Sequence, residues 1–245
     1  MKHLLAALMA TTALAGTAVA ADLPSRAYAP AVVAPIAYTW SGLYVGINAG
    51  YGWGDTKRRF DTAGHYNLLA GDGFRRDVDG WLVGGHLGYN FQINNFVLGL
   101  EGSIAWSDID KRNAVSPYFP ATDRWTSKVN WLASITPRVG VAFDRALIYV
   151  KGGVAFGEVS DRVNDGVDFV SAKNTRTGWT LGAGVEYAIT NNVVFGVEYN
   201  YYDLGKYRVN KASTDIATGV TQPFGTNHRV DTTVNTVTAR LSYKF

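Results

Sequence analysis

The stretch GWLVGGHLGYNFQINNFVLGLEGSIAW, residues 80–106, decides the fold. Every second residue from Trp81 to Phe91 is mostly a large apolar type, and the residues between them are mainly glycine, histidine and asparagine. This period of two is typical of a β-strand. After the polar turn at 92–95 the alternation resumes and continues to Trp106. The stretch therefore predicts two long strands joined by a tight hairpin turn.

The same alternation recurs along the chain and predicts an all-β fold of eight strands. The expected strands are residues 43–53, 81–91, 97–106, 129–143, 148–156, 179–189, 193–202 and 236–245. Short turns alternate with four long polar loops, expected at 55–77, 107–127, 158–175 and 203–231. This asymmetry is typical of an antiparallel up-and-down transmembrane β-barrel. Within the fourth strand, Pro137 predicts a β-bulge because proline cannot donate a ladder hydrogen bond.

Two kinds of eight-stranded barrel fit this pattern, and they differ in which face is inside. In a soluble barrel of lipocalin type the apolar face would point inward, but an interior of this width holds only side chains or one small ligand. The apolar face carries most of the tryptophan, tyrosine, phenylalanine and leucine, which is too much volume for that space. We therefore expect the apolar face to contact lipid and the small polar face to line the lumen. Tryptophans near the loop ends and phenylalanines and tyrosines near the turn ends predict two aromatic girdles.

The N-terminus predicts export. Residues 1–20 combine a basic start, a short apolar run and an Ala-x-Ala site, which is the pattern of a cleaved secretory signal peptide. Residues 21–39 are rich in proline and alanine and predict an extended periplasmic tail, leaving 40–245 for the barrel. The chain has no cysteine and therefore no disulfide, and its balance of 23 basic and 20 acidic residues gives no support to a nucleic-acid partner.

Several ordered motifs resemble those of one protein family. They are WSGLYVG at 40–46, GYGWG at 50–54, GG at 84–85, GYN at 88–90, RVG at 138–140, GWT at 178–180, EY at 198–199 and the final YKF at 243–245. Together they are similar to the small outer-membrane β-barrel proteins of alphaproteobacteria, the 25/31-kilodalton outer-membrane proteins. The resemblance implies an abundant surface antigen that supports envelope integrity, with some relatives described as porins and some attached to peptidoglycan. It also implies that Phe245 is the signal read by the barrel-assembly machinery.

We therefore expect an integral protein of the Gram-negative outer membrane, with extracellular loops and periplasmic termini. Its expected role is structural, with contacts to outer-membrane lipid and, through the tail, to peptidoglycan. The alternatives are a narrow porin-like channel for small solutes and adhesion through the loops. We expect no enzyme activity, metal or cofactor, because the histidines at 3, 65, 86 and 228 are not spaced with nucleophiles or metal ligands.

Two groups of charged residues are candidate functional residues. The alternation places one charge inside each strand from the third to the eighth: Glu101, Arg138, Lys151, Glu186, Glu198 and Arg240. Because an unpaired charge costs several kcal/mol in so narrow a lumen, we predict a salt-bridge network that closes it, with Tyr149 and Tyr202 beside it. The competing view is that these charges line a pore. The second group, expected either to bind lipopolysaccharide phosphates or simply to be solvated, comprises Lys57, Arg58, Arg59, Arg75 and Arg76.

Overall fold

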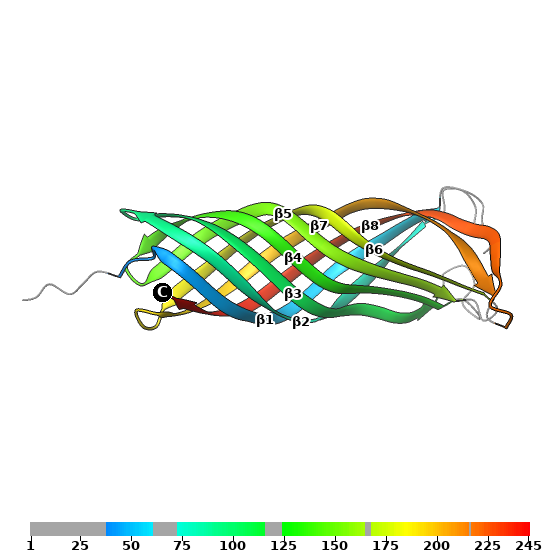
Figure 1. The fold of residues 1–245 in the computed structure, drawn as a ribbon, viewed down its shortest axis with the longest axis horizontal. Coiled ribbons are helices and arrows are strands. Elements are labelled where there is room, and N and C mark those ends of the chain that lie inside the picture. Colours follow the sequence, from blue (N-terminus) through cyan, green and yellow to red (C-terminus); the bar gives the residue numbers. More distant parts are fainter. Residues whose placement is uncertain (1–37, 61–72, 116–123, 165–167, 216) are drawn as a thin grey trace, which may run out of the picture. The chain divides into compact units, whose positions relative to one another are not determined.

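A computed structural model of the chain describes residues 38–60, 73–115, 124–164, 168–215 and 217–245. These residues form one closed barrel in which each strand pairs antiparallel with the next and β1 pairs with β8 (Figure 1). The strands are β1 (Gly42–Phe60), β2 (Gly73–Ile93), β3 (Phe96–Val115), β4 (Arg124–Phe143), β5 (Ala146–Asn164), β6 (Asp168–Ala188), β7 (Val193–Asp215) and β8 (Thr221–Lys244). The predicted eight-stranded antiparallel barrel is confirmed.

The strands are longer at one end than predicted. Much of each segment expected to be a long loop continues the ladder instead; Asp55 to Phe60, for example, extends β1 and pairs with the start of β2 or with β8. Their outward face is mostly charged or polar, so the outward apolar alternation that marks the membrane band stops there, although inward residues such as Ile109, Val159 and Leu204 are apolar. Paired backbone groups hold them together as strands, because a ladder satisfies every N–H and C=O whatever the side chains are.

The tight turns lie at the opposite end. Asn94 between β2 and β3 and Asp144 between β4 and β5 have φ values of 53° and 51°. Asparagine and aspartate tolerate this left-handed conformation better than most residues, which explains their presence in the two hairpin turns. We call the end with these turns the turn end and the opposite end of the barrel the loop end.

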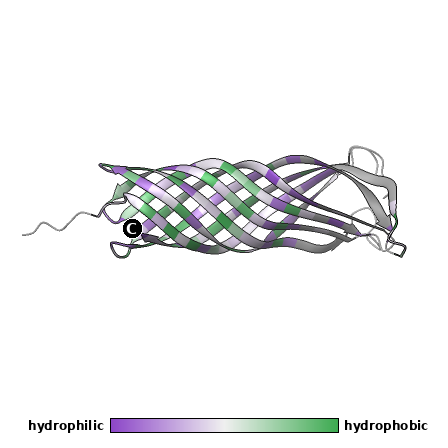
Figure 2. Ribbon diagram, in the orientation of Figure 1, coloured by the Kyte–Doolittle hydropathy of each residue, from purple (hydrophilic) through white to green (hydrophobic). Residues whose placement is uncertain are grey.

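The apolar face points outward. Val45, Leu100 and Val185 in the middle of their strands are 43%, 56% and 52% exposed, as their positions in the alternation predict. Hydrophobic residues concentrate over the part of the barrel nearer the C-terminus (Figure 2). Within the described residues, no helix is long and apolar enough to cross a membrane.

Two local predictions are wrong. Pro137 stays in register opposite Leu100, and the pairs on either side of it with β5 share one register, so there is no bulge at the proline. The register of β4 with β5 shifts instead between Val129 and Trp131. An extra residue reverses the alternation, and Val129, expected on the outer face, is only 2% exposed.

Candidate functional site: the filled lumen

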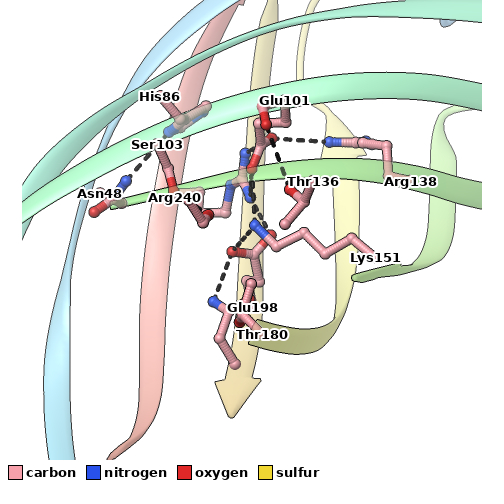
Figure 3. Close-up of polar contacts among 12 residues, drawn as sticks. Asn48, His86, Glu101, Ser103, Thr136, Arg138, Lys151, Thr180, Glu198 and Arg240 are labelled. Carbon is pink, nitrogen blue, oxygen red and sulfur yellow. Dashed lines mark hydrogen bonds and ion pairs between the residues drawn. The ribbon is translucent and has the colours of Figure 1, made fainter. Parts of the chain in front are cut away.

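The six predicted lumen charges lie together in the middle of the barrel. Each comes from a different strand, and each is between 1% and 4% exposed. The side chains of five of them, Glu101, Arg138, Lys151, Glu198 and Arg240, point toward one another across the lumen in Figure 3. The members of this group, which we call the lumen network, are Glu101 on β3, Arg138 on β4, Lys151 on β5, Glu186 on β6, Glu198 on β7 and Arg240 on β8.

Glu101 is the hub of the lumen network because it contacts all three bases. Arg240 Nη2 lies 2.5 Å from Glu101 Oε2, and Arg138 Nη1 lies 3.3 Å from the same oxygen. Lys151 Nζ donates to Glu101 Oε1 at 2.8 Å. One carboxylate therefore links β4, β5 and β8, so removing its charge would affect three cations at once.

The other two carboxylates complete the network. Arg138 donates through both terminal nitrogens to Glu186, at 2.7 and 3.2 Å, in the two-point geometry that favours arginine over lysine. Lys151 Nζ lies 2.7 Å from Glu198 Oε1, and Arg240 also pairs with Glu198. Three acids and three bases balance one another, which is the condition for keeping charges in a lumen with little water.

Two tyrosines fill the space beside the lumen network. Tyr149 donates to Glu198 at 2.5 Å, and Arg138 stacks 4.1 Å from the centre of its ring. Tyr44, which the alternation places inside although it was not predicted to join the network, donates to Glu101 at 2.8 Å. A Cβ atom on Gly184 would lie 2.5 Å from the Tyr149 hydroxyl, so the missing side chain makes room for the ring.

An apolar layer covers the lumen network toward the loop end, where we expected small polar groups. Its buried members are Val78, Leu82, Ile109, Val129, Leu132, Ala155, Val159, Tyr202, Leu204 and Val234. Tyr202 therefore packs in this layer above the charges. Five of these ten residues lie outside the expected strands, three of them in expected loops, so their inward orientation follows only from the extended strands. A cavity of about 20 Å³ remains between this apolar layer and the lumen network, which is room for about one water molecule.

A second apolar layer lies below the network, at the turn end, and includes residues that precede the first strand. Trp40 is 1% exposed and donates its indole N–H to the Asp144 carbonyl at 3.1 Å. Tyr38 packs edge-on against Trp40 with ring centres 5.1 Å apart, and burial, with a smaller effect of Glu186, raises the pKa of its hydroxyl to about 12. Val97 and Leu147 pack in the same layer. The charges are thus enclosed between two apolar layers.

The five bases predicted to contact lipopolysaccharide are not equivalent. Lys57 and Arg59 point outward and are exposed. Arg58 lies between them, and because successive residues of a strand point to opposite faces, it faces the lumen and is only 3% exposed. It cannot contact lipid outside the barrel, so the prediction is wrong for Arg58. Arg75 is exposed but pairs through two nitrogens with Asp55. The side chain of Arg76 lies outside the described residues.

Phe245 and His86 lie on the faces of their strands that the alternation predicts. Phe245 is 66% exposed at the turn end, and its N–H donates to the Leu43 carbonyl at 2.9 Å. His86 faces the lumen, as its position in the alternation predicts, with Nε2 2.8 Å from the Ser242 hydroxyl. The signal peptide and all of the tail before Tyr38 lie outside the described residues. In the described part of the chain, no three histidine, aspartate or glutamate side chains are grouped to hold a metal ion.

Comparison with known proteins agrees with this architecture. A family model described as "Outer membrane protein beta-barrel domain" matches residues 4–245. A 31 kDa outer-membrane immunogenic protein of Brucella melitensis is 36% identical over 82% of this chain and 85% of its own. A 25 kDa outer-membrane immunogenic protein of Brucella ovis is 33% identical over 89% and 94%. A 22 kDa outer membrane protein of Rhizobium leguminosarum is 32% identical over 67% and 64%.

Proposed function

Because the chain belongs to the outer membrane protein β-barrel domain family, and is thus an integral outer-membrane protein, we propose that it is a closed barrel with a structural role in the envelope. The observation that supports this proposal is the closely paired lumen network. A stable closed barrel contributes to envelope integrity by occupying the outer membrane without opening a path through it.

Closure is favoured over conduction by the spacing of the charges. A selective pore needs its charged groups to stand apart around water. In the lumen network every carboxylate is within 2.8 Å of a base: Glu101 of Lys151, Glu186 of Arg138, and Glu198 of Lys151. The apolar layers above and below the network would also have to part before water or ions could pass.

Planar-bilayer recording of the purified full-length protein tests this proposal. We expect a silent membrane after insertion, with insertion verified independently by the heat-dependent electrophoretic shift of the folded barrel. Steady open steps from the wild-type protein would overturn the closed-barrel proposal. A change of cation preference in Glu101→Gln, without loss of stability, would then assign the lumen network to a narrow channel.

The surface part of the role depends on orientation, which we propose to be loop end outside and turn end in the periplasm. The Brucella relatives are named immunogenic outer-membrane proteins, which supports exposure of some part of the fold. Because the chain has no cysteine, single cysteines can report orientation. Thr218→Cys at the loop end should react with a membrane-impermeant maleimide on intact cells, whereas Asn191→Cys at the turn end should react only after lysis. The reverse pattern would refute this orientation.

A further inference from the structure

The seam between β1 and β8 is where the two ends of the chain meet to close the barrel. Every other pair of neighbouring strands is consecutive in the sequence, so a turn or a loop joins it at one end. The chain joins β1 to β8 at neither end, and the strands are held only by their ladder and by side chains. If this seam opened, it would expose two strand edges with unpaired N–H and C=O groups. The barrel therefore needs a non-covalent fastening at this seam more than at any other.

At the turn end, hydrogen bonds bridge the seams that have no covalent turn there. Three of these seams are bridged by two residues that exchange two hydrogen bonds: Asn95 with Ala142 (β3–β4), Arg145 with Ala188 (β5–β6) and Asn192 with Lys244 (β7–β8). Each of these pairs includes a residue of a hairpin turn or its edge. No hairpin turn precedes β1, so the two seams of β1 depend on the residues just before it. We call residues 38–41 the strap.

The strap bridges both seams of β1. Gln92, near the end of β2, donates its N–H to Ser41 Oγ at 2.9 Å and accepts the Trp40 N–H through Oε1 at 2.7 Å. On the other side, Lys244 of β8 donates to the Ser41 carbonyl at 3.4 Å, and its Nζ lies 5.1 Å from the centre of the Tyr38 ring. Ser41 thus links β8 to β2 across the start of β1.

The strap also reaches across the mouth of the barrel to the β4–β5 turn, half-way round from β1. Trp40 donates its indole N–H to the Asp144 carbonyl at 3.1 Å, and Arg145 lies 5.5 Å from the centre of the Tyr38 ring. The Trp40 side chain is buried in the second apolar layer. At this end, β1 therefore cannot move away from β8 unless Trp40 first leaves that layer.

We propose that the strap holds the β1–β8 seam closed, at the one pair of strands that the chain itself does not connect. Its contacts come from β2, β8 and the β4–β5 turn together, so the whole set forms only when the cylinder has closed. Contacts that form after the folding transition state slow unfolding and have little effect on the folding rate. The proposal concerns closure at the turn end and is independent of whether the lumen conducts.

The experiment measures the unfolding and refolding rates of the full-length protein in lipid vesicles, from the time course of its heat-dependent electrophoretic shift. Trp40→Ala should raise the unfolding rate at least about tenfold, because a large buried side chain is lost, and should change the refolding rate much less. Leu147→Ala is the matched control: Leu147 is buried in the same apolar layer but belongs to β5 and not to the strap. It should also unfold faster, through loss of packing alone.

Engineered disulfides separate seam closure from packing, because the chain has no cysteine of its own. Val45→Cys with Tyr243→Cys forms the seam staple, since these residues are direct partners on the outer faces of β1 and β8. Val139→Cys with Val150→Cys forms the hairpin staple in the same way across β4 and β5, which a turn already joins. Each single variant is compared with the wild-type sequence carrying the same staple, as in a double-mutant cycle.

The seam staple should reduce the effect of Trp40→Ala from about tenfold to less than about threefold, because a covalent bond then does what the strap does. The hairpin staple should leave that effect unchanged, and the seam staple should leave the effect of Leu147→Ala unchanged. Trp40→Phe keeps a ring but lacks the indole N–H, so it should show a smaller effect of the same kind and replaces Trp40→Ala if that variant fails to fold. A Trp40 effect that persists in full with the seam staple would refute the proposal. Equal relief of Leu147→Ala by the same staple would also refute it.

Discussion

Glu101→Gln should destabilise the barrel strongly, because the change removes the hub of the lumen network while keeping the shape of the side chain. The wild-type carboxylate accepts hydrogen bonds from Arg240, Lys151, Arg138 and Tyr44. After the change, three buried cations share two carboxylates. Charged hydrogen bonds contribute about 1.5–3 kcal/mol each, but the amide oxygen and the remaining acids recover part of this loss. Breaking a buried ion pair by removing one partner costs about 3–5 kcal/mol, which is the decrease we expect in the free energy of unfolding.

The assay is a reversible urea titration of the protein in lipid vesicles, followed by tryptophan fluorescence. Glu158→Gln is the control, since it makes the same chemical change in an outward pair with Lys173 and should have little effect. Adding Lys151→Met to Glu101→Gln restores two acids and two bases, so it should recover at least about 1 kcal/mol. If Glu101→Gln unfolds at the same urea concentration as Glu158→Gln, the lumen network is not the structural element that we describe.

Three further predictions concern the outer face, the close packing of the lumen and the C-terminus. Leu100→Arg in the middle of the apolar band should cost about 2–4 kcal/mol in the same titration, whereas Val220→Arg near the loop tip should be tolerated; equal costs would contradict the lipid-facing assignment. Gly184→Ala should cost about 1–3 kcal/mol by displacing the tyrosine it faces, but the outward Gly102→Ala, whose Cβ would meet only the Leu87 carbonyl oxygen at 4.0 Å, should not; a harmless Gly184→Ala would show that the lumen is loosely packed. Phe245→Ala should lower the amount of folded barrel in outer-membrane fractions without slowing refolding in vesicles; normal amounts in cells would exclude an assembly signal at this residue.

The sequence predicted the barrel and its charged interior because both depend only on the period of two. Glu101 and Arg240 face the lumen as soon as their strands are identified. Which partners meet across the lumen was not predictable, since that depends on the register of strands far apart in the sequence. Tyr44 was missed for this reason, although its place in the alternation already indicated an inward side chain.

The loop end was less predictable than the membrane band. There the strands continue through polar sequence. β-bulges also alter the alternation at this end, without a sequence signal as clear as a proline. At Pro137, where the proline predicted a bulge, the register is unbroken. The pairing of β8 with both of its neighbours near the loop end depends on a register shift and on barrel closure. The register of β7 with β8 shifts between Asp203 and Lys206, and β1 pairs with β8 only when the barrel closes. No local pattern brings Arg59 beside Arg229.

The order in which the lumen charges follow one another around the barrel also affects how the barrel assembles. Arg138 and Lys151 are direct partners in the β4–β5 hairpin, so this hairpin, formed alone, brings two positive charges together. Their carboxylate partners come from β3, β6 and β7, and Arg240 reaches Glu101 only across the finished cylinder. In an open sheet Arg138 can still meet Glu101 on the adjacent β3, but the contact of Arg240 with Glu101 forms only when the cylinder closes. Contacts that form this late act mainly on the rate of unfolding, so we expect the lumen network to lengthen the lifetime of the assembled barrel more than it speeds its formation.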